Sequence, residues 1–151
     1  MNKIILSIEL VPSSSWLNNV RNILSQTQWD IIKNIVYSKA YYICEICGGV
    51  GPKHPVECHE IWKYNDKKLT QHLEGMVALC PNCHMVKHIG LARIRGDEDK
   101  AIAHLMKVNN WTYKKSIKYI QKCFDIWRKR SSKKWKLSIS HLKEYGIDIE
   151  K

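Results

Sequence analysis

The stretch "LCPNCHMVKH", residues 79–88, brings two cysteines and two histidines into ten residues of the chain. A second Cys-x-x-C pair lies upstream in "CEIC", residues 44–47. Two such pairs can supply four thiolates to one tetrahedral Zn²⁺, whereas a thioredoxin-like redox site, the main alternative, needs one pair on a βαβ scaffold. We therefore predict a structural zinc site with the ligands Cys44, Cys47, Cys80 and Cys83.

The segment between the two pairs is longer than the roughly 15–20 residues of a simple zinc ribbon, so an insertion is expected there. Glycines and a proline in "GGVGP", residues 48–52, predict a tight turn. "VECHEIWKYN", residues 56–65, and "HLEGMVALC", residues 72–80, each have the pattern of a strand. From Pro81 the pattern becomes helical, and Gly90 is the expected C-cap of that helix.

The N-terminal flank combines an apolar stretch with a helix. Residues 3–11 are expected to form a first β-strand. Ser25 and Gln28 have the spacing of a capping box that begins a helix. The apolar stripe that follows has the helical period and is expected to be core; its members are Trp29, Ile32 and Val36.

The C-terminal flank is predicted to be mostly helical. One helix is expected around "EDKAIAHLMKV", residues 98–108, and a second after Thr112, which can serve as its N-cap. "KWKLSIS", residues 134–140, alternates like a short strand. The apolar stripe of the second helix is expected to be Tyr113, Ile117, Ile120, Phe124 and Trp127.

Charge and composition indicate the class of partner. Lys plus Arg number 25 against 14 for Asp plus Glu, which gives a formal net charge of +11. A protein this basic favours a nucleic-acid partner, although a lysine-rich solvated surface is the alternative. No apolar run reaches the roughly 18 residues of a membrane span, and the cysteine pattern is typical of a reducing, cytoplasmic (intracellular) compartment. Trp62 and Trp135 have basic neighbours and are candidates for stacking on bases.

The histidines near the second cysteine pair are not needed by a four-thiolate zinc site. His84 and His88 stand four apart on the predicted helix and therefore share one face. His59 lies on the first predicted strand of the insertion, between Cys58 and Glu60. Because imidazole can take a proton or bind a metal near neutral pH, three such residues beside a zinc knuckle indicate a functional site.

In "CEIC", "ECHEIW" and "LCPNCHMVKH" the chain resembles the HNH (His-Asn-His) endonucleases, in their zinc-bearing branch with a ββα-metal finger. A longer pattern also resembles small HNH proteins of bacteria and phages. The resemblance implies a hydrolase that cleaves phosphodiester bonds in DNA, with His59 as general base and His84 on a second divalent cation, Mg, Mn, Ni or Zn. His88 and Cys58 are further candidate ligands of that cation, and candidate phosphate contacts are Lys87, Arg93 and Arg95.

Two positions depart from the pattern of that family. Cys58 stands where the family usually has Asp or His, and Gly75 stands where the middle Asn is expected. A thiolate is a poor ligand for Mg²⁺ but an acceptable one for Zn²⁺ or Ni²⁺, and Glu60 is a possible substitute. The alternatives are a non-catalytic zinc-finger protein that binds nucleic acid through a degenerate nuclease site, and a purely structural or interaction protein.

The predicted architecture is one α+β domain, residues 1–151. Its centre is an HNH-like ββα-metal core stapled by zinc, residues 41–90. An N-terminal strand and helices, residues 1–40, and a C-terminal helical extension, residues 96–145, are expected to flank that core.

Overall fold

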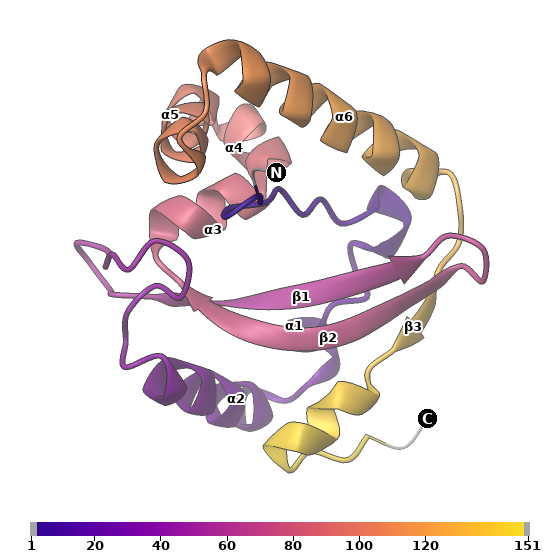
Figure 1. The fold of residues 1–151 in the computed structure, drawn as a ribbon. Helices are drawn as coiled ribbons and strands as arrows, with labels where there is room; N and C mark the ends of the chain where they lie inside the picture. Colours follow the sequence, from indigo (N-terminus) through magenta and orange to yellow (C-terminus); the bar gives the residue numbers. More distant parts are fainter. Residues whose placement is uncertain (1–2, 150–151) are drawn as a thin grey trace.

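The computed structural model describes residues 3–149, which form an α+β fold around a three-stranded sheet (Figure 1). The sheet order is β1-β2-β3, so β2 is the central strand. The α+β class and all three strands expected from residue 56 onward are confirmed. β1 (Glu57–Asn65) pairs antiparallel with β2 (Thr70–Leu79), and β3 (Lys136–Ser138) adds to β2 in parallel.

One face of the sheet is covered by the helices that follow the hairpin. Their apolar side chains, with Leu6 and Ile8 of the N-terminal segment, form the first core cluster. This cluster includes three of the cysteines, so the predicted zinc site is continuous with the core. The helices on this face are α3 (Pro81–Lys87), α4 (Ile89–Arg95), α5 (Glu98–Asn109) and α6 (Tyr113–Ser131).

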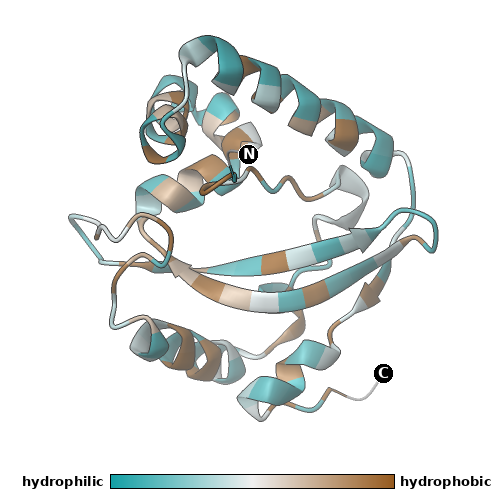
Figure 2. Ribbon diagram, viewed as in Figure 1, coloured by the Kyte–Doolittle hydropathy of each residue, from teal (hydrophilic) through white to brown (hydrophobic). Residues whose placement is uncertain are grey.

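The second core cluster lies on the opposite face, under α2 (Figure 1). Brown apolar bands recur along α2, whereas hydrophilic colour dominates α6 (Figure 2). The capping box is confirmed, because the Ser25 side chain accepts from Gln28 N and the Gln28 side chain accepts from Ser25 N. The predicted stripe of Trp29, Ile32 and Val36 is buried. The elements on this side are α1 (Val20–Ile23), α2 (Gln26–Lys39) and the 3₁₀ helix η2 (Ser140–Tyr145).

The prediction of a strand at residues 3–11 is wrong, because that segment joins no sheet. Its backbone hydrogen bonds go mainly to side chains: Asn109 Oδ1 accepts from Leu6 N at 3.0 Å, and Tyr119 Oη accepts from Ile8 N at 3.0 Å. Side chains of α5 and α6 thus satisfy groups that a neighbouring strand would otherwise pair. A short 3₁₀ helix, η1 (Ser13–Ser15), follows the segment.

Two smaller predictions also need correction. The helix that begins at Pro81 does not end at Gly90: α3 ends at Lys87, His88 breaks the helix with φ −108° and ψ 47°, and Gly90 lies within α4. Tyr113 is not core, since it is 60% exposed at the start of α6. The Thr112 cap is confirmed, because its side chain accepts from Lys115 N.

No helix within residues 3–149 is long and apolar enough to cross a membrane. The division of the chain into a core at residues 41–90 and two flanking parts stays a prediction.

Candidate metal centres

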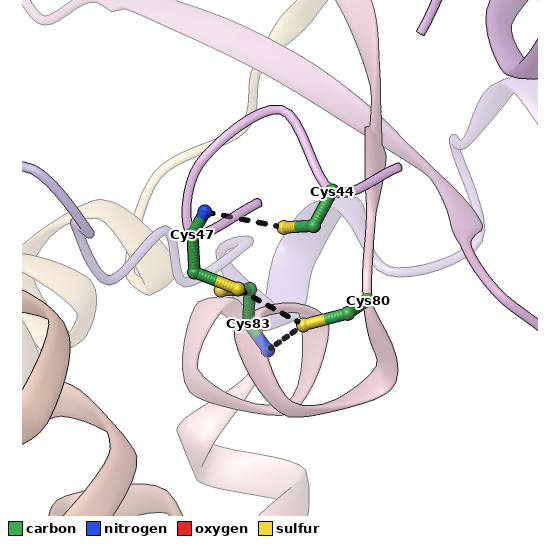
Figure 3. A group of neighbouring side chains, drawn as sticks. All are labelled: Cys44, Cys47, Cys80 and Cys83. Carbon is green, nitrogen blue, oxygen red and sulfur yellow. Dashed lines mark hydrogen bonds between the residues drawn. The ribbon is translucent and has the colours of Figure 1, made fainter. Parts of the chain in front are cut away.

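The four cysteines of the two pairs converge on one point (Figure 3). Their sulfur atoms all lie within 4.8 Å of one another, and Cys47 Sγ lies 3.6 Å from Cys80 Sγ. Tetrahedral zinc with Zn–S bonds of about 2.3 Å holds its sulfurs about 3.8 Å apart. The tetra-cysteine group therefore fits a metal ion such as zinc.

Backbone geometry prepares this group for thiolates. Cys80 is the N-cap of α3, and its Sγ accepts from Cys83 N at 3.4 Å. In the first knuckle, Cys44 Sγ accepts from Cys47 N at 3.5 Å and Cys47 Sγ accepts from Gly49 N at 3.4 Å. Each N–H group stabilises the negative charge of the thiolate, and the thiolate is the form of cysteine that binds a metal.

The pKa values of three of the thiols indicate what a bound ion would change. Burial, with repulsion from the neighbouring cysteines, raises the pKa of Cys80 to about 11 and also raises that of Cys83. Burial acts in the same direction on Cys44, but backbone N–H donors outweigh it and lower its pKa to about 7. Four adjacent thiolates without a cation would repel one another, so a bound cation would stabilise this cluster strongly.

A second group of potential ligands lies nearby and consists of histidines alone. His59 comes from β1, His84 from α3, and His88 from the break between α3 and α4. Their ring centroids are 5.3 Å apart for His59 and His84, 5.2 Å for His59 and His88, and 4.9 Å for His84 and His88. One nitrogen of each lies within 4.8 Å of the others. The structure thus brings together all three histidines that the sequence singled out.

Two glutamates orient these rings. Glu57 Oε1 lies 2.9 Å from His84 Nδ1, and Glu9 Oε1 lies 3.4 Å from His59 Nε2. Burial raises the pKa of both carboxyls, but their partners outweigh it: His84 and His54 lower the pKa of Glu57, and His59 and Lys87 lower that of Glu9 to about 2. An ionised carboxylate can only accept, so His84 Nδ1 and His59 Nε2 are the protonated nitrogens.

The remaining nitrogens are available as lone-pair donors. Within residues 3–149, His59 Nδ1 is buried without a hydrogen-bond partner. Burial lowers the pKa of His59, and burial with repulsion from His59 and His84 lowers that of His88 to about 3. Both rings are therefore neutral at pH 7, the form that binds a metal or accepts a proton.

Two residues predicted to serve this site are directed elsewhere. Cys58 is adjacent to His59 on β1 and so points to the opposite face, where its Sγ lies 3.8 Å from Met76 Sδ. Burial raises the pKa of its thiol to about 12. Lys87 is buried, and its ammonium contacts Glu9 and Ser7, so it is not free to bind phosphate.

The two arginines of the prediction lie at the surface. Arg93 pairs with Glu98, lies 4.2 Å above the Phe124 ring, and keeps a half-exposed side chain. Arg95 is exposed at the end of α4. The predicted contact of Arg93 and Arg95 with phosphate stays a prediction.

Two candidate stacking tryptophans and the possible substitute ligand Glu60 are held by hydrogen bonds within the fold. Trp135 is buried, and its indole N–H donates to Arg130 O, so it is not a free stacking surface. Trp62 is half-buried and donates to Glu60 Oε2. Glu60 also accepts from Val20 N, which commits its carboxylate to α1 rather than to the histidines.

Sequence reasoning missed Glu9 and Glu57. Glu57 could have been found, because it stands two residues before His59 and strand alternation puts both on one face. Glu9 gives no such signal, since it lies 50 residues from its histidine. Comparison of the chain with protein-family models, with characterised proteins and with solved structures found no match.

Proposed function

We propose that this chain is a metal-dependent endonuclease of the HNH type that hydrolyses phosphodiester bonds in DNA. The hairpin β1–β2 followed by α3 would be its ββα-metal core. The observation that carries the proposal is the meeting of His59, His84 and His88 from separate elements, with ring centroids no more than 5.3 Å apart. That group lies beside the cysteine cluster, which would hold strand and helix in fixed relation.

His84 and His88 would hold the catalytic cation. Glu57 keeps the proton on Nδ1 of His84, which leaves Nε2 as the donor atom. Imidazole ligands suit Ni²⁺ or Zn²⁺ better than Mg²⁺ or Mn²⁺, which prefer oxygen. A cation held there would supply positive charge to the phosphate and to the leaving oxygen.

His59 would act as the general base. Glu9 keeps the proton on Nε2, which leaves the unpartnered Nδ1 to take a proton from water. Once protonated, the ring is stabilised by the same carboxylate. Because Lys87 also contacts Glu9, that carboxylate is held in place from two sides.

Charge supports DNA as the substrate. The net charge is +11, and one face of α6 carries four exposed lysines. Such a surface attracts the phosphate backbone irrespective of base sequence. These lysines are Lys114, Lys115, Lys118 and Lys122.

The test is a nicking assay on supercoiled plasmid with Mg²⁺, Mn²⁺, Ni²⁺ or Zn²⁺ added. Wild-type protein should nick, most strongly with a transition metal, and His59→Ala and His84→Ala should each lose about 100-fold or more in rate. His141→Ala is the matched control, because His141 lies in η2 on the other side of the sheet.

If the protein binds DNA but nicks it with none of these metals, the non-catalytic alternative is supported. The position of Cys58, on the face opposite the histidines, favours that alternative. Absence of both binding and nicking would overturn the proposal altogether. Equal loss in His141→Ala would show that the effect of the other two substitutions is not specific to the site.

A further inference from the structure

Two basic segments that are distant in the sequence lie side by side at one end of the molecule. One is the tip of the β1–β2 hairpin, residues 63–69, and the other leads from the end of α6 to β3, residues 128–136. Figure 1 shows the hairpin turn beside the chain that leaves α6. Together the two segments, called here the basic end, carry nine Lys or Arg residues and a single carboxylate, that of Asp66.

Hydrogen bonds fix the two segments of the basic end against each other. The Arg130 guanidinium donates to both carboxylate oxygens of Asp66, at 3.0 and 3.1 Å, and lies 4.6 Å from the centre of the Tyr64 ring. The backbone N–H of Lys136 donates to Leu69 O at 2.8 Å, next to the pairing of β3 with β2. The basic end is therefore a fixed part of the fold.

Most of the positive charge of the basic end is exposed to solvent. The backbone N–H groups of Lys67 and Lys68 donate to Asn65 Oδ1 at 3.1 and 3.0 Å, which fixes the backbone of both lysines at the tip of the hairpin. Like charges gathered in this way repel one another and destabilise the folded state. A polyanion bound here would remove that repulsion. The exposed basic residues are Lys63, Lys67, Lys68, Lys129, Lys133, Lys134, Lys136 and Arg128, of which Arg128 also pairs with Asp125.

The side chains of the basic end favour a phosphate backbone over other anionic partners. A surface that binds a membrane adds apolar anchors to its lysines, and a site for single strands adds aromatic rings that stack on bases. Within the part of the chain that the structure describes, no exposed large apolar or aromatic side chain falls in residues 63–69 or 128–136. The aromatic residues there are the half-buried Tyr64 and the buried Trp135. Double-stranded DNA needs neither kind of contact, because its backbone offers one charge per about 1.7 Å of helix axis.

The basic end also has a defined relation to the histidine site. Strand alternation puts Lys63 on the same face of β1 as His59, and the end of β1 at Asn65 lies about 20 Å beyond His59 at roughly 3.3 Å per residue. A cavity of about 790 Å³ borders both regions, since His59 and Arg130 each line it. At about 3.4 Å per base pair, this distance corresponds to roughly six base pairs of duplex.

We propose that the basic end holds the phosphate backbone of double-stranded DNA, roughly six base pairs from the bond that the histidines would cleave. The proposal rests on the nuclease function above for the position of that bond. Because its contacts are made to phosphates, the basic end adds affinity and orients the duplex without reading its sequence.

The test is fluorescence anisotropy of the full chain with a duplex of about 20 base pairs at several salt concentrations. Lys67→Gln with Lys134→Gln should weaken binding about tenfold and reduce the slope of log affinity against log salt by about two, one for each phosphate contact removed. Lys100→Gln with Lys107→Gln is the matched control. It removes the same charge from α5, which lies at the other end of the molecule from the hairpin turn, and should leave the slope unchanged (Figure 1). An unchanged slope in the first variant would refute the proposal.

Two further ligands separate duplex DNA from the other anionic partners. They are a single strand of the same length and vesicles of phosphatidylcholine with about one-third phosphatidylserine. Wild-type protein should bind the duplex about tenfold tighter than the single strand, because the duplex carries more charge per unit length. If the Lys67→Gln, Lys134→Gln variant loses affinity for the vesicles or the single strand and keeps its affinity for the duplex, the basic end belongs to that other partner and the proposal is wrong.

Failure of this proposal can be told apart from failure of the nuclease function. Weaker duplex binding in the Lys67→Gln, Lys134→Gln variant would support the basic end even if wild-type protein nicks no plasmid. If wild-type protein does nick, its nicks should be rare within roughly six base pairs of one end of a labelled strand, and the variant should lose that end effect. Nicking together with unchanged duplex affinity in the variant would reject the basic end and leave the nuclease function intact.

Discussion

At the scale of single residues, the histidine site depends on carboxylates that are distant in sequence. Glu9 reaches His59 from the N-terminal segment, and the same carboxylate faces Lys87, whose side chain is 6% exposed. The cysteine and histidine positions could be predicted because their spacing is local. Glu9 could not, since a glutamate in an extended segment looks like an ordinary surface residue until the fold buries it.

Glu9→Gln should lower the free energy of unfolding by about 3 kcal/mol at pH 7, because it leaves the Lys87 charge buried without its partner. The pKa of Glu9 is about 2, against an ordinary value of 4.5. Its contribution is therefore fully present above about pH 4.5 and is lost as pH falls towards 2. Urea denaturation at several pH values checks this.

Glu98→Gln is the matched control for that experiment, because it breaks an ion pair with the half-exposed Arg93. Its effect should stay below about 1 kcal/mol. A loss in Glu9→Gln that persists undiminished at pH 2.5 would contradict the assignment of the effect to this ion pair.

Gly51→Ala tests the packing of the first cysteine knuckle. A Cβ at Gly51 would clash with His54 O and lie 2.7 Å from Pro81 Cδ, so the loop and the start of α3 would be forced apart. We expect a loss of about 2 kcal/mol or more and weaker zinc retention, measured by thermal unfolding and metal analysis. Gly75→Ala is the control: its nearest neighbour would be 3.8 Å away, and it should be tolerated.

At the scale of elements, the sequence predicted what neighbouring residues determine. The β1–β2 hairpin follows from apolar alternation and a polar turn, and α2 begins where its capping box predicts. Predictions failed where distant groups decide the backbone. Residues 3–11 have the composition of a strand, but Asn109 and Tyr119 take their hydrogen bonds, and His88 breaks a helix that its periodicity would continue.

Removal of the zinc ligands should melt the junction between the hairpin and α3. Cys80→Ser is expected to lower the bound metal by about one ion per chain and to unfold the middle of the protein, since structural zinc supplies folding energy. Metal analysis and near-ultraviolet circular dichroism check this. Cys123→Ser, at a half-buried thiol outside the cluster, should keep its metal. A folded, metal-free wild-type protein would rule out the site.

Ser25→Ala should lower the free energy of unfolding by about 1 kcal/mol, because it removes the acceptor for the Gln28 backbone N–H at the start of α2. Chemical denaturation measures the change. Ser38→Ala, at an exposed position near the end of the same helix, should change it by less than about 0.5 kcal/mol. Equal effects would show that propensity, and not the cap, is responsible.

At the scale of the whole molecule, the exposed lysines of α6 lie on one side of the sheet. The elements α2 and η2 lie on the opposite side (Figure 1). The sequence gives the sum of charge but not its distribution, because that depends on which helix faces which side of the sheet. An anionic partner should therefore bind across α6, above the cavity that α6 helps to line.

Lys118→Gln with Lys122→Gln should weaken DNA binding at every sequence and reduce the slope of log affinity against log salt by about one to two, the number of phosphate contacts removed. Fluorescence anisotropy at several salt concentrations measures it. Lys39→Gln with Lys143→Gln removes the same charge from the opposite side and should leave the slope unchanged. The reverse result would move the DNA surface to the α2 side.

The N-terminal segment has one further consequence for how the chain is made. Its hydrogen-bond partner Asn109 is synthesised 104 residues after Ile5, and Trp127, whose indole N–H donates to Val11 O, comes later still. On the ribosome, the N-terminal segment therefore lacks these partners until α5 and α6 have emerged. If Glu9 and His59 activate water as proposed, a nascent chain without α5 and α6 would be harmless to nucleic acid, and the ability to cut would follow the synthesis of those two helices.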